Sequence, residues 1–190
     1  ISGADSRRDL PAPDYDWHLK LCNWLWRQNP IAKKGVQNIR AFVASEGFRV
    51  RANCPQDRQR QMMQQLLNEH WELNEWDDEL SRRVETLGVE GEWLYYASEP
   101  NPHTGHIKLC KILPENVKDI TRCPLNAEQL RTVELSCALE EQLHDGTLRK
   151  LSSLPIAHIN AHSQVEGNLL YLGINRLSGQ TRGWSDLLVV

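Results

Sequence analysis

The sequence lacks a long apolar run, paired cysteines and a marked excess of either charge. No window approaches the run of about eighteen apolar residues that would span a membrane, and the first residues contain no apolar core of a secretion signal. The five cysteines are scattered and never spaced as C-x-x-C, which argues against a disulfide framework and favours a reducing, intracellular origin. The formal net charge of −3 argues against a surface built throughout to hold nucleic acid.

Short catalytic motifs are also missing. There is no G-x-x-x-x-G-K-[ST] phosphate loop, no G-x-S-x-G nucleophile elbow and no H-E-x-x-H zinc helix. The carboxylates between Asp77 and Glu92 show no sign of the two distinct environments that acid–base catalysis requires, so we expect them on a solvated helix face. His158 and His162 are expected on a half-exposed strand face. We therefore expect no catalytic residue, no cofactor and no enzymatic activity.

The strongest candidate for a metal site is a set of two histidines and two cysteines. His103, His106 and Cys110 are spaced H-x-x-H-x-x-x-C, and Cys123 follows. Structural zinc sites take closely spaced pairs of ligands at both ends, and the second pair is missing here. The sequence therefore favours polar loop histidines beside a buried thiol, with no bound metal.

Helical periodicity dominates the first half of the chain. Asp14 is predicted to cap a helix over residues 15–28, and Asn29 and Pro30 suit the N-cap and first position of the next helix. Further helices are predicted over about residues 57–73 and from residue 74 onward. The predicted apolar faces are Trp17, Leu21, Trp24 and Leu25; Ile31, Val36, Ile39, Phe42 and Val43; Met62, Met63, Leu66, Leu67, His70 and Trp71; and Trp76, Leu80, Val84 and Leu87.

Strand patterns dominate the second half of the chain, with one strand predicted among the helices of the first half. That strand is segment 48–52 (FRVRA), which alternates apolar and basic residues and is predicted to be short and half-buried. Asp145-Gly146 is a strong hairpin signal. Helices followed by antiparallel strands predict an α+β fold. The later strands are expected over residues 92–98, 106–113, 116–123, 130–143, 147–152 and 155–162.

Four segments, taken in order, give the chain a family resemblance. They are NPIAKKGVQNIRAFVASEGFRVRA, LLNEHWELNEWDDELSRRVETLGVEGEWLYY, HIKLCKILPENVKDI and AHINAHSQVEGNLLYLGINRLSGQTRGWSDLL. In this order and at these separations they resemble blocks of the tailed-bacteriophage portal proteins, the head–tail connectors. The resemblance covers the chain from about Asn29 to its end. It rests on the order of the four segments, because no single motif among them is diagnostic.

The resemblance implies a division of the chain and a structural role for its motif residues. Residues 1–14 would be a flexible arm, residues 15–180 a wing-like α+β domain, and residues 181–190 the start of a stem helix. The rest of the stem, the clip and the crown would follow. The family-motif residues would be structural: Gly183 as a conformationally free position, Arg182 paired with a carboxylate, and Ser185 or Asp186 capping the helix. The motif residues are Asn29, Pro30, Arg182, Gly183, Ser185 and Asp186.

The implied function is mechanical. A portal is a homo-oligomeric ring, commonly a dodecamer, at one vertex of the virion capsid, with no membrane involved and with assembly in the host cytoplasm. Its partners would be the major capsid protein, the terminase large subunit, the head-completion and tail proteins, and double-stranded DNA passing through the channel. Trp17, Trp24 and Trp26 are expected to pack against the capsid or a neighbouring subunit.

Two other readings stay open from the sequence. One is a nucleic-acid-binding or virion structural adaptor module, which would carry a concentrated basic face. The other is a metal-dependent hydrolase that uses His103, His106 and Cys110, which a stoichiometric metal in the purified protein would support.

Overall fold

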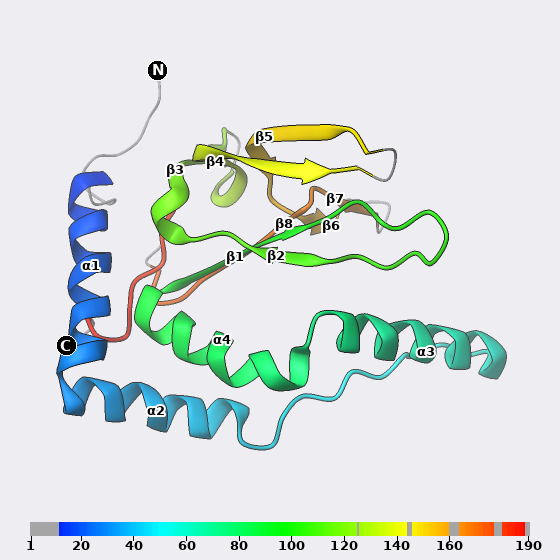
Figure 1. Cartoon of the computed structure of the whole chain (residues 1–190), viewed down its shortest axis with the longest axis horizontal. Coiled ribbons are helices and arrows are strands. Elements are labelled where there is room, and N and C mark those ends of the chain that lie inside the picture. Colours follow the sequence, from blue (N-terminus) through cyan, green and yellow to red (C-terminus); the bar gives the residue numbers. More distant parts are fainter. Residues whose placement is uncertain (1–11, 125, 144–145, 160–163, 177–179, 189–190) are drawn as a thin grey trace.

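The computed structural model describes residues 12–124, 126–143, 146–159, 164–176 and 180–188. Four helices come first and antiparallel strands follow, so the predicted α+β fold is confirmed. In Figure 1, α1 stands at one end of the molecule, α3 projects from the other end, and α2 and α4 lie between them. The helices are α1 (Ala12–Gln28), α2 (Pro30–Ala44), α3 (Asp57–Leu73) and α4 (Trp76–Glu90).

The strands form two three-stranded antiparallel sheets and one small hairpin. The first sheet has the order β2-β1-β8 and the second the order β3-β4-β5, while β6 pairs with β7. A 3-10 turn, η1 (Pro114–Asn116), connects β2 to β3. The strands are β1 (Glu92–Ala97), β2 (Leu109–Lys111), β3 (Val117–Cys123), β4 (Asn126–Gln142), β5 (Leu148–Pro155), β6 (His158–Ile159), β7 (Val165–Glu166) and β8 (Leu169–Gly173).

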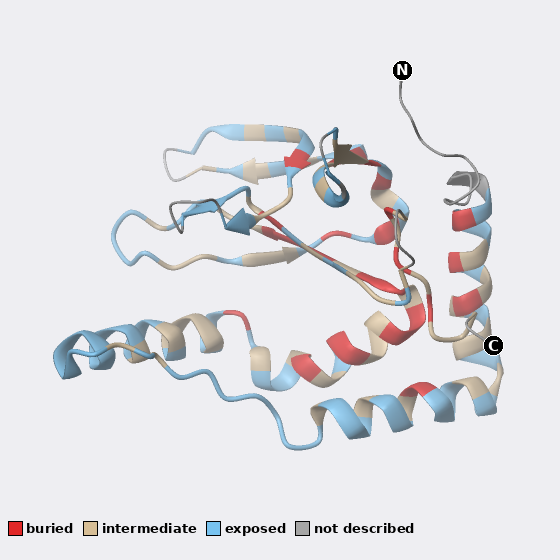
Figure 2. Cartoon of the chain, turned by 180° about the vertical axis from the view of Figure 1, so that it is seen from behind, coloured by how far each residue is buried: buried red, intermediate tan, exposed pale blue. Residues whose placement is uncertain are grey.

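The main hydrophobic core is shared by the two sheets, as the red strand segments of Figure 2 show. Leu94 of β1, Val133 of β4, Leu154 of β5 and Leu169 of β8 are all fully buried in it. A smaller cluster joins the helices through Cys22 of α1, Val36 of α2 and Val89 of α4. These two cores fix the position of the α4–β1 connection, which lies between them.

The first helix differs from its prediction in both start and orientation. It begins at Ala12, inside the predicted arm 1–14, and Asp14 lies exposed in its first turn instead of capping it. The buried face consists of Tyr15, Leu19 and Cys22, so the predicted apolar face around Trp17 points outward. The predicted face was wrong because it assumed that the tryptophans of α1 are buried, whereas Trp17 and Trp24 are exposed. The rest of the predicted arm, residues 1–11, lies outside the described residues.

Segment 48–52 is extended, but it is not a strand. Its backbone pairs with a side chain of α3: the Gln64 amide accepts from the Ala52 N–H at 2.9 Å and donates to the Val50 carbonyl at 3.1 Å. The alternating pattern of FRVRA therefore belongs to an extended segment whose backbone hydrogen-bonds to the Gln64 side chain instead of to another strand. The strand predicted over 155–162 is also wrong in extent, because only His158–Ile159 is a strand of its own and Pro155 ends β5. Residues 160–163 lie outside the described residues.

Candidate functional site

The family-motif residues at the end of the chain meet the α4–β1 connection in one buried joint. We call this the Glu92 joint, and it consists of residues 88–92 and 182–186 together with Tyr15 and Tyr171. Figure 1 shows the C-terminal segment (red) running between α1 and α4 to reach it. Glu92 is the first residue of β1, and its side chain has no solvent exposure.

Hydrogen-bond donors surround the Glu92 carboxylate. The Arg182 guanidinium donates through Nε at 3.1 and 3.2 Å and also through Nη2. The Tyr15 hydroxyl donates at 2.9 Å, the Tyr171 hydroxyl at 3.1 Å and the Gly183 backbone N–H at 3.3 Å. Arg182 also stacks on the Tyr15 ring, 3.8 Å from its centroid, and donates to the Pro114 carbonyl at 3.1 Å. The predicted pairing of Arg182 with a carboxylate is therefore confirmed.

The electrostatics of the joint favour a fixed ion pair over proton transfer. Burial opposes the charge on Arg182, but the Glu92 carboxylate outweighs it and raises the pKa of the guanidinium. Burial and the nearby Glu92 carboxylate raise the pKa of both Tyr15 and Tyr171 well above the usual value of a phenol. Both hydroxyls therefore remain protonated donors at neutral pH. A buried pair of this kind holds its two segments in one arrangement, because separating them would leave each charge buried without a partner.

Two glycines allow the backbones of the joint to touch. A Cβ at Gly183 would lie 2.1 Å from the Gly91 carbonyl oxygen, and a Cβ at Gly91 would lie 2.3 Å from the Trp184 carbonyl carbon. Gly91 also has a positive φ of 82° as the cap of α4. Gly183 was predicted to supply conformational freedom. The structure instead requires it for close approach, since its φ is not in the left-handed region.

Ser185 and Asp186 complete the joint with different roles. The Ser185 hydroxyl donates to the Gly88 carbonyl at 2.9 Å and accepts from the Leu187 N–H at 3.1 Å, as an N-cap side chain does. The Asp186 carboxylate instead accepts from the Asn175 amide at 2.8 Å. Ser185 therefore makes the bond that is typical of a cap, but residues 186–188 form a turn and no helix follows within the described residues, so the stem helix over 181–190 stays a prediction. The turn that follows is described as far as Leu188.

The other predicted cap is confirmed at the start of α2. The Asn29 side chain accepts from the backbone N–H groups of Ile31 and Ala32 at 2.9 and 3.3 Å, and Pro30 is the first residue of the helix. Asn29 and Pro30 lie far from the Glu92 joint in sequence, and they shape the α1–α2 corner instead. The family-motif residues thus occupy two separate structural positions.

The histidines and cysteines proposed as metal ligands are dispersed. His103 is exposed in the β1–β2 loop, and the His106 ring nitrogen Nε2 lies 3.1 Å from a carboxylate oxygen of Glu69 in α3. Cys110 is in β2, whereas Cys123 ends β3 in the other sheet. Within the ranges that the structure describes, no three His, Cys, Asp or Glu side chains form a group that could hold a metal ion.

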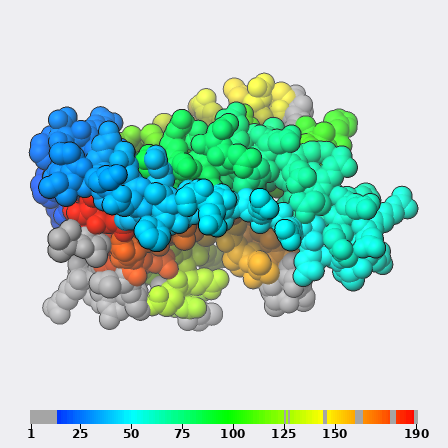
Figure 3. Space-filling view, turned by 90° about the horizontal axis from the view of Figure 1, so that it is seen from below, coloured from blue at the N-terminus to red at the C-terminus, as the bar shows by residue number. Residues whose placement is uncertain are grey.

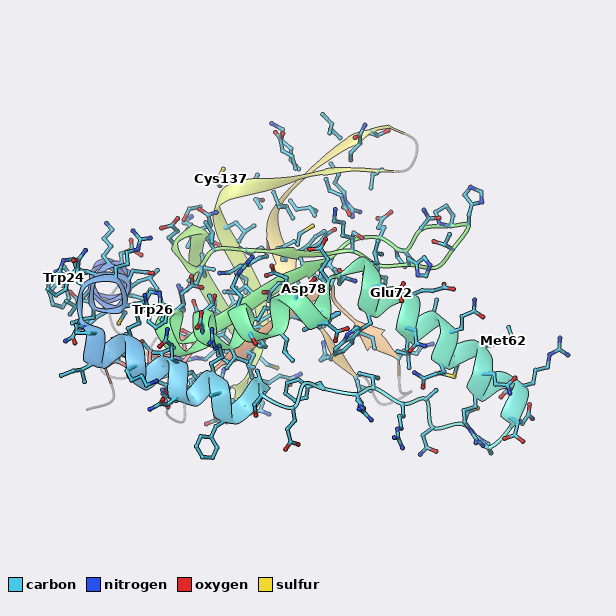
Figure 4. All side chains as sticks on the ribbon, turned by 60° about the horizontal axis from the view of Figure 1, so that its bottom comes forward. Trp24, Trp26, Met62, Glu72, Asp78 and Cys137 are labelled. Atoms are coloured by element: carbon cyan, nitrogen blue, oxygen red, sulfur yellow. The ribbon has the colours of Figure 1, made fainter. Side chains whose placement is uncertain are left out.

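The tryptophans named as a candidate interface separate into two groups. Trp17 and Trp24 are each 59% exposed on the outer face of α1. Trp26 is half-buried against the Cys22 and Val36 cluster, so it belongs to the fold of the monomer. Figure 4 shows Trp24 and Trp26 at the α1 end of the molecule and Met62 of α3 at the opposite end.

The third helix has the predicted bounds but not the predicted burial. Among its residues none is buried, and Met62, Met63, Leu66 and Leu73 are 45–65% exposed. An open groove of about 520 Å³ runs between α3 and segment 48–52, with Arg49, Arg51 and Arg60 along its walls. Figure 3 shows α2 and the segment after it lying along this side of the molecule towards α3.

Sequence reasoning missed Tyr15 and Tyr171, and it was wrong about Glu92, which it placed on a solvated helix face and which is instead fully buried at the start of β1. A charged residue at the start of the apolar strand EWLYYA was the one available signal, because an ionised side chain within a core must have a partner. That partner, Arg182, is ninety positions away, and no spacing rule reaches so far.

No protein-family model matches this chain, and no curated protein matches it significantly. In the described part of the chain, no helix combines the length and apolar character needed to cross a membrane.

Proposed function

We propose that this chain is a subunit of a phage portal, a homo-oligomeric ring at one capsid vertex through which double-stranded DNA is packaged and ejected. Its partners would be the major capsid protein, the terminase large subunit, and the head-completion and tail proteins. The observation that carries the proposal is the pair of exposed apolar helix faces, on α1 and α3, at opposite ends of the molecule. Two different faces at opposite ends suit a head-to-tail contact, which closes into a ring when its rotation allows.

Two further features support the proposal. The Arg-Gly-x-Ser-Asp segment, which belongs to the last of the four segments behind the resemblance to portal proteins, is built into the Glu92 joint instead of lying free on the surface. The carboxylate at the centre of that joint already accepts bonds from Arg182, Tyr15 and Tyr171, which leaves it unsuited to acid–base catalysis. A structural role in an assembly fits both features.

The experiment is to measure the oligomeric mass of the full-length protein and to image it by electron microscopy. We expect closed rings with a central hole. A homogeneous monomer at all concentrations would contradict the proposal. Replacing the exposed pair with Trp17→Ala and Trp24→Ala is expected to reduce ring assembly without loss of folding. The matched Trp26→Ala variant is expected to lower the stability of the monomer instead, because Trp26 packs against the helical core.

A nucleic-acid-binding module is the second candidate, and one observation favours it. Residues 29–60 contain seven basic and two acidic residues, a net charge of +5, while the remainder of the chain carries −8. Most of these basic side chains are exposed, on α2, on segment 48–52 and at the start of α3. A monomer that binds duplex DNA with an affinity falling steeply with salt would favour this candidate over the ring.

A further inference from the structure

The outward face of α3 changes in character from one end of the helix to the other. Gln64, Leu67 and Trp71 face segment 48–52. The opposite face, reached by steps of three and four residues, begins with Arg58, continues with Met62 and Leu66, and ends beside Glu72. It is therefore basic at the start, apolar in the middle and acidic at the end.

The outward face of α1 has the reverse order of charge. The helix is 17 residues long, as α3 is, and its buried face contains Tyr15, Leu19 and Cys22. The opposite face begins with Asp14, continues with Trp17 and Trp24, and ends with Arg27. It is acidic at the start, aromatic in the middle and basic at the end.

The four charged residues at the helix ends are exposed. In the described part of the chain, Asp14, Arg27, Arg58 and Glu72 form no ion pair, although many other exposed charges do. The two faces also cannot meet in one molecule, because α1 and α3 lie at opposite ends of it (Figure 1, Figure 4). The described part of the chain therefore leaves both faces uncovered, and a second copy can supply an occupant for each.

A parallel alignment of α1 with α3 matches the two faces. Setting Trp17 opposite Met62 brings Arg27 opposite Glu72, because both pairs are separated by 45 positions. The same alignment places Asp14 next to Arg58. An antiparallel alignment would instead bring Arg27 to the basic end of α3 and Asp14 to its acidic end, and like charges in contact are unfavourable.

We propose that α3 of one copy docks in parallel on α1 of the next copy, with Trp17 packed on Met62 and Trp24 packed one turn beyond Leu66, beside Glu69. Arg27 pairs with Glu72 at one end of the contact, and Asp14 pairs with Arg58 at the other. The proposal rests on the proposed function, since it names the surfaces through which the subunits of the ring join. It requires that each copy uses two different faces, so the contact is head-to-tail.

Cysteine pairing tests the contact directly. In the full-length protein, a chain with both Arg27→Cys and Glu72→Cys is expected to give a ladder of covalent oligomers on mild oxidation, because each copy carries both halves of the contact. A mixture of the two single variants is expected to give cross-linked dimers alone. Each single variant by itself is expected to match the parent chain with its five native cysteines, and cross-linking within one single variant would overturn the head-to-tail arrangement.

Charge reversal provides an independent test. Arg27→Glu and Glu72→Arg are each expected to weaken assembly by at least about tenfold, and the double reversal is expected to restore it, because like charges in contact cost several kcal/mol. Rings that form normally in all three variants, with no cross-linked ladder, would overturn the docking but leave the portal proposal standing. A ladder without closed rings or capsid incorporation would support the docking and contradict the portal. A monomeric parent chain would overturn both.

Discussion

Arg182 illustrates how one residue can hold together parts of the chain that are ninety positions apart. Its guanidinium joins the C-terminal segment to β1 through Glu92 and to α1 through the Tyr15 ring. The pair is buried, so its main contribution is to specify one arrangement of these elements. The sequence predicts that Arg182 pairs with a carboxylate, and the place of Glu92 at the start of an apolar strand marks it as a charge in need of a partner, but no local pattern connects the two residues.

Removing one partner of this pair is expected to be more damaging than removing both. Arg182→Met leaves the Glu92 carboxylate buried without its cation, and we expect a loss of about 3–5 kcal/mol in the free energy of unfolding. The double variant Glu92→Gln with Arg182→Met is expected to lose less. Denaturant unfolding of the three proteins measures this, and a loss below about 1 kcal/mol for Arg182→Met would contradict the role given to the pair.

Gly183 and Gly35 form a matched pair for testing close approach. Gly183→Ala would force its Cβ into the Gly91 carbonyl and is expected to destabilise the protein by several kcal/mol, on the order of other overpacked sites. Gly35→Ala meets nothing within 4 Å on the surface of α2 and is expected to stabilise the helix by up to about 1 kcal/mol. Thermal unfolding compares them, and equal effects would rule out the contact as the reason for glycine at position 183.

At the scale of elements, the hairpin of β4 and β5 is attached to β1 by charged hydrogen bonds. The Glu141 carboxylate of β4 accepts from the Tyr96 hydroxyl of β1 at 2.7 Å and from Arg149 of β5 at 3.1 Å. Burial alone would raise the pKa of Glu141, but these bonds and the Glu99 backbone N–H hold it below its usual value. The ionised form is therefore the one that ties the three strands together.

The lowered pKa fixes the sign of the pH dependence. Because the folded protein holds the Glu141 proton less tightly than the unfolded chain, the stabilisation is complete above the ordinary glutamate pKa of about 4.3 and is lost as the pH falls through the lower folded value. Glu141→Gln is expected to cost about 1–3 kcal/mol at pH 7 and to match the wild type in strong acid. Denaturant unfolding across pH tests this, and a difference that persists at low pH would contradict it.

The extended segment before α3 depends on a single side chain. Gln64→Ala removes both bonds to the backbone of Val50 and Ala52, so we expect faster hydrogen exchange at the Ala52 N–H while α4 is unaffected. Gln65→Ala is the control, because Gln65 bonds only to the exposed Glu69 side chain. Equal exchange in the two variants would show that α3 holds the segment by other contacts.

The helices show that apolar periodicity predicts the bounds of a helix better than it predicts which of its faces is buried. The bounds of α3 follow from its polar start and its apolar spacing, and the prediction of residues 57–73 matches the structure. Periodicity reports that an apolar stripe exists, but it does not tell whether the same chain covers it. For this reason Met62 and Leu66 were predicted to lie against the fold and are instead exposed. Alternation likewise predicted a strand at 48–52 without revealing that a glutamine would pair with it.

At the scale of the whole molecule, the distribution of charge matters more than its sum. The net charge of −3 conceals a stretch of +5 over residues 29–60 and −8 over the remainder. The proposed contact pairs Arg27 with Glu72 and Asp14 with Arg58, so the copies should associate less tightly as salt rises. We expect subunit affinity to fall several-fold between low and high salt while the apolar contact persists, which sedimentation at several salt concentrations would measure. An affinity that rises with salt would point to an association without charge pairing.

The Glu92 joint also determines how the molecule would respond to tension on its C-terminal segment. Arg182, Trp184, Ser185 and Asp186 are each bonded to the body of the protein, three of them to the α4–β1 connection. A pull at Leu188 would be opposed by all of these bonds, which attach the segment to α4, to β1 and to the residue after β8. The segment should therefore transmit force to both cores before it detaches, which makes the joint a rigid coupling and not a hinge.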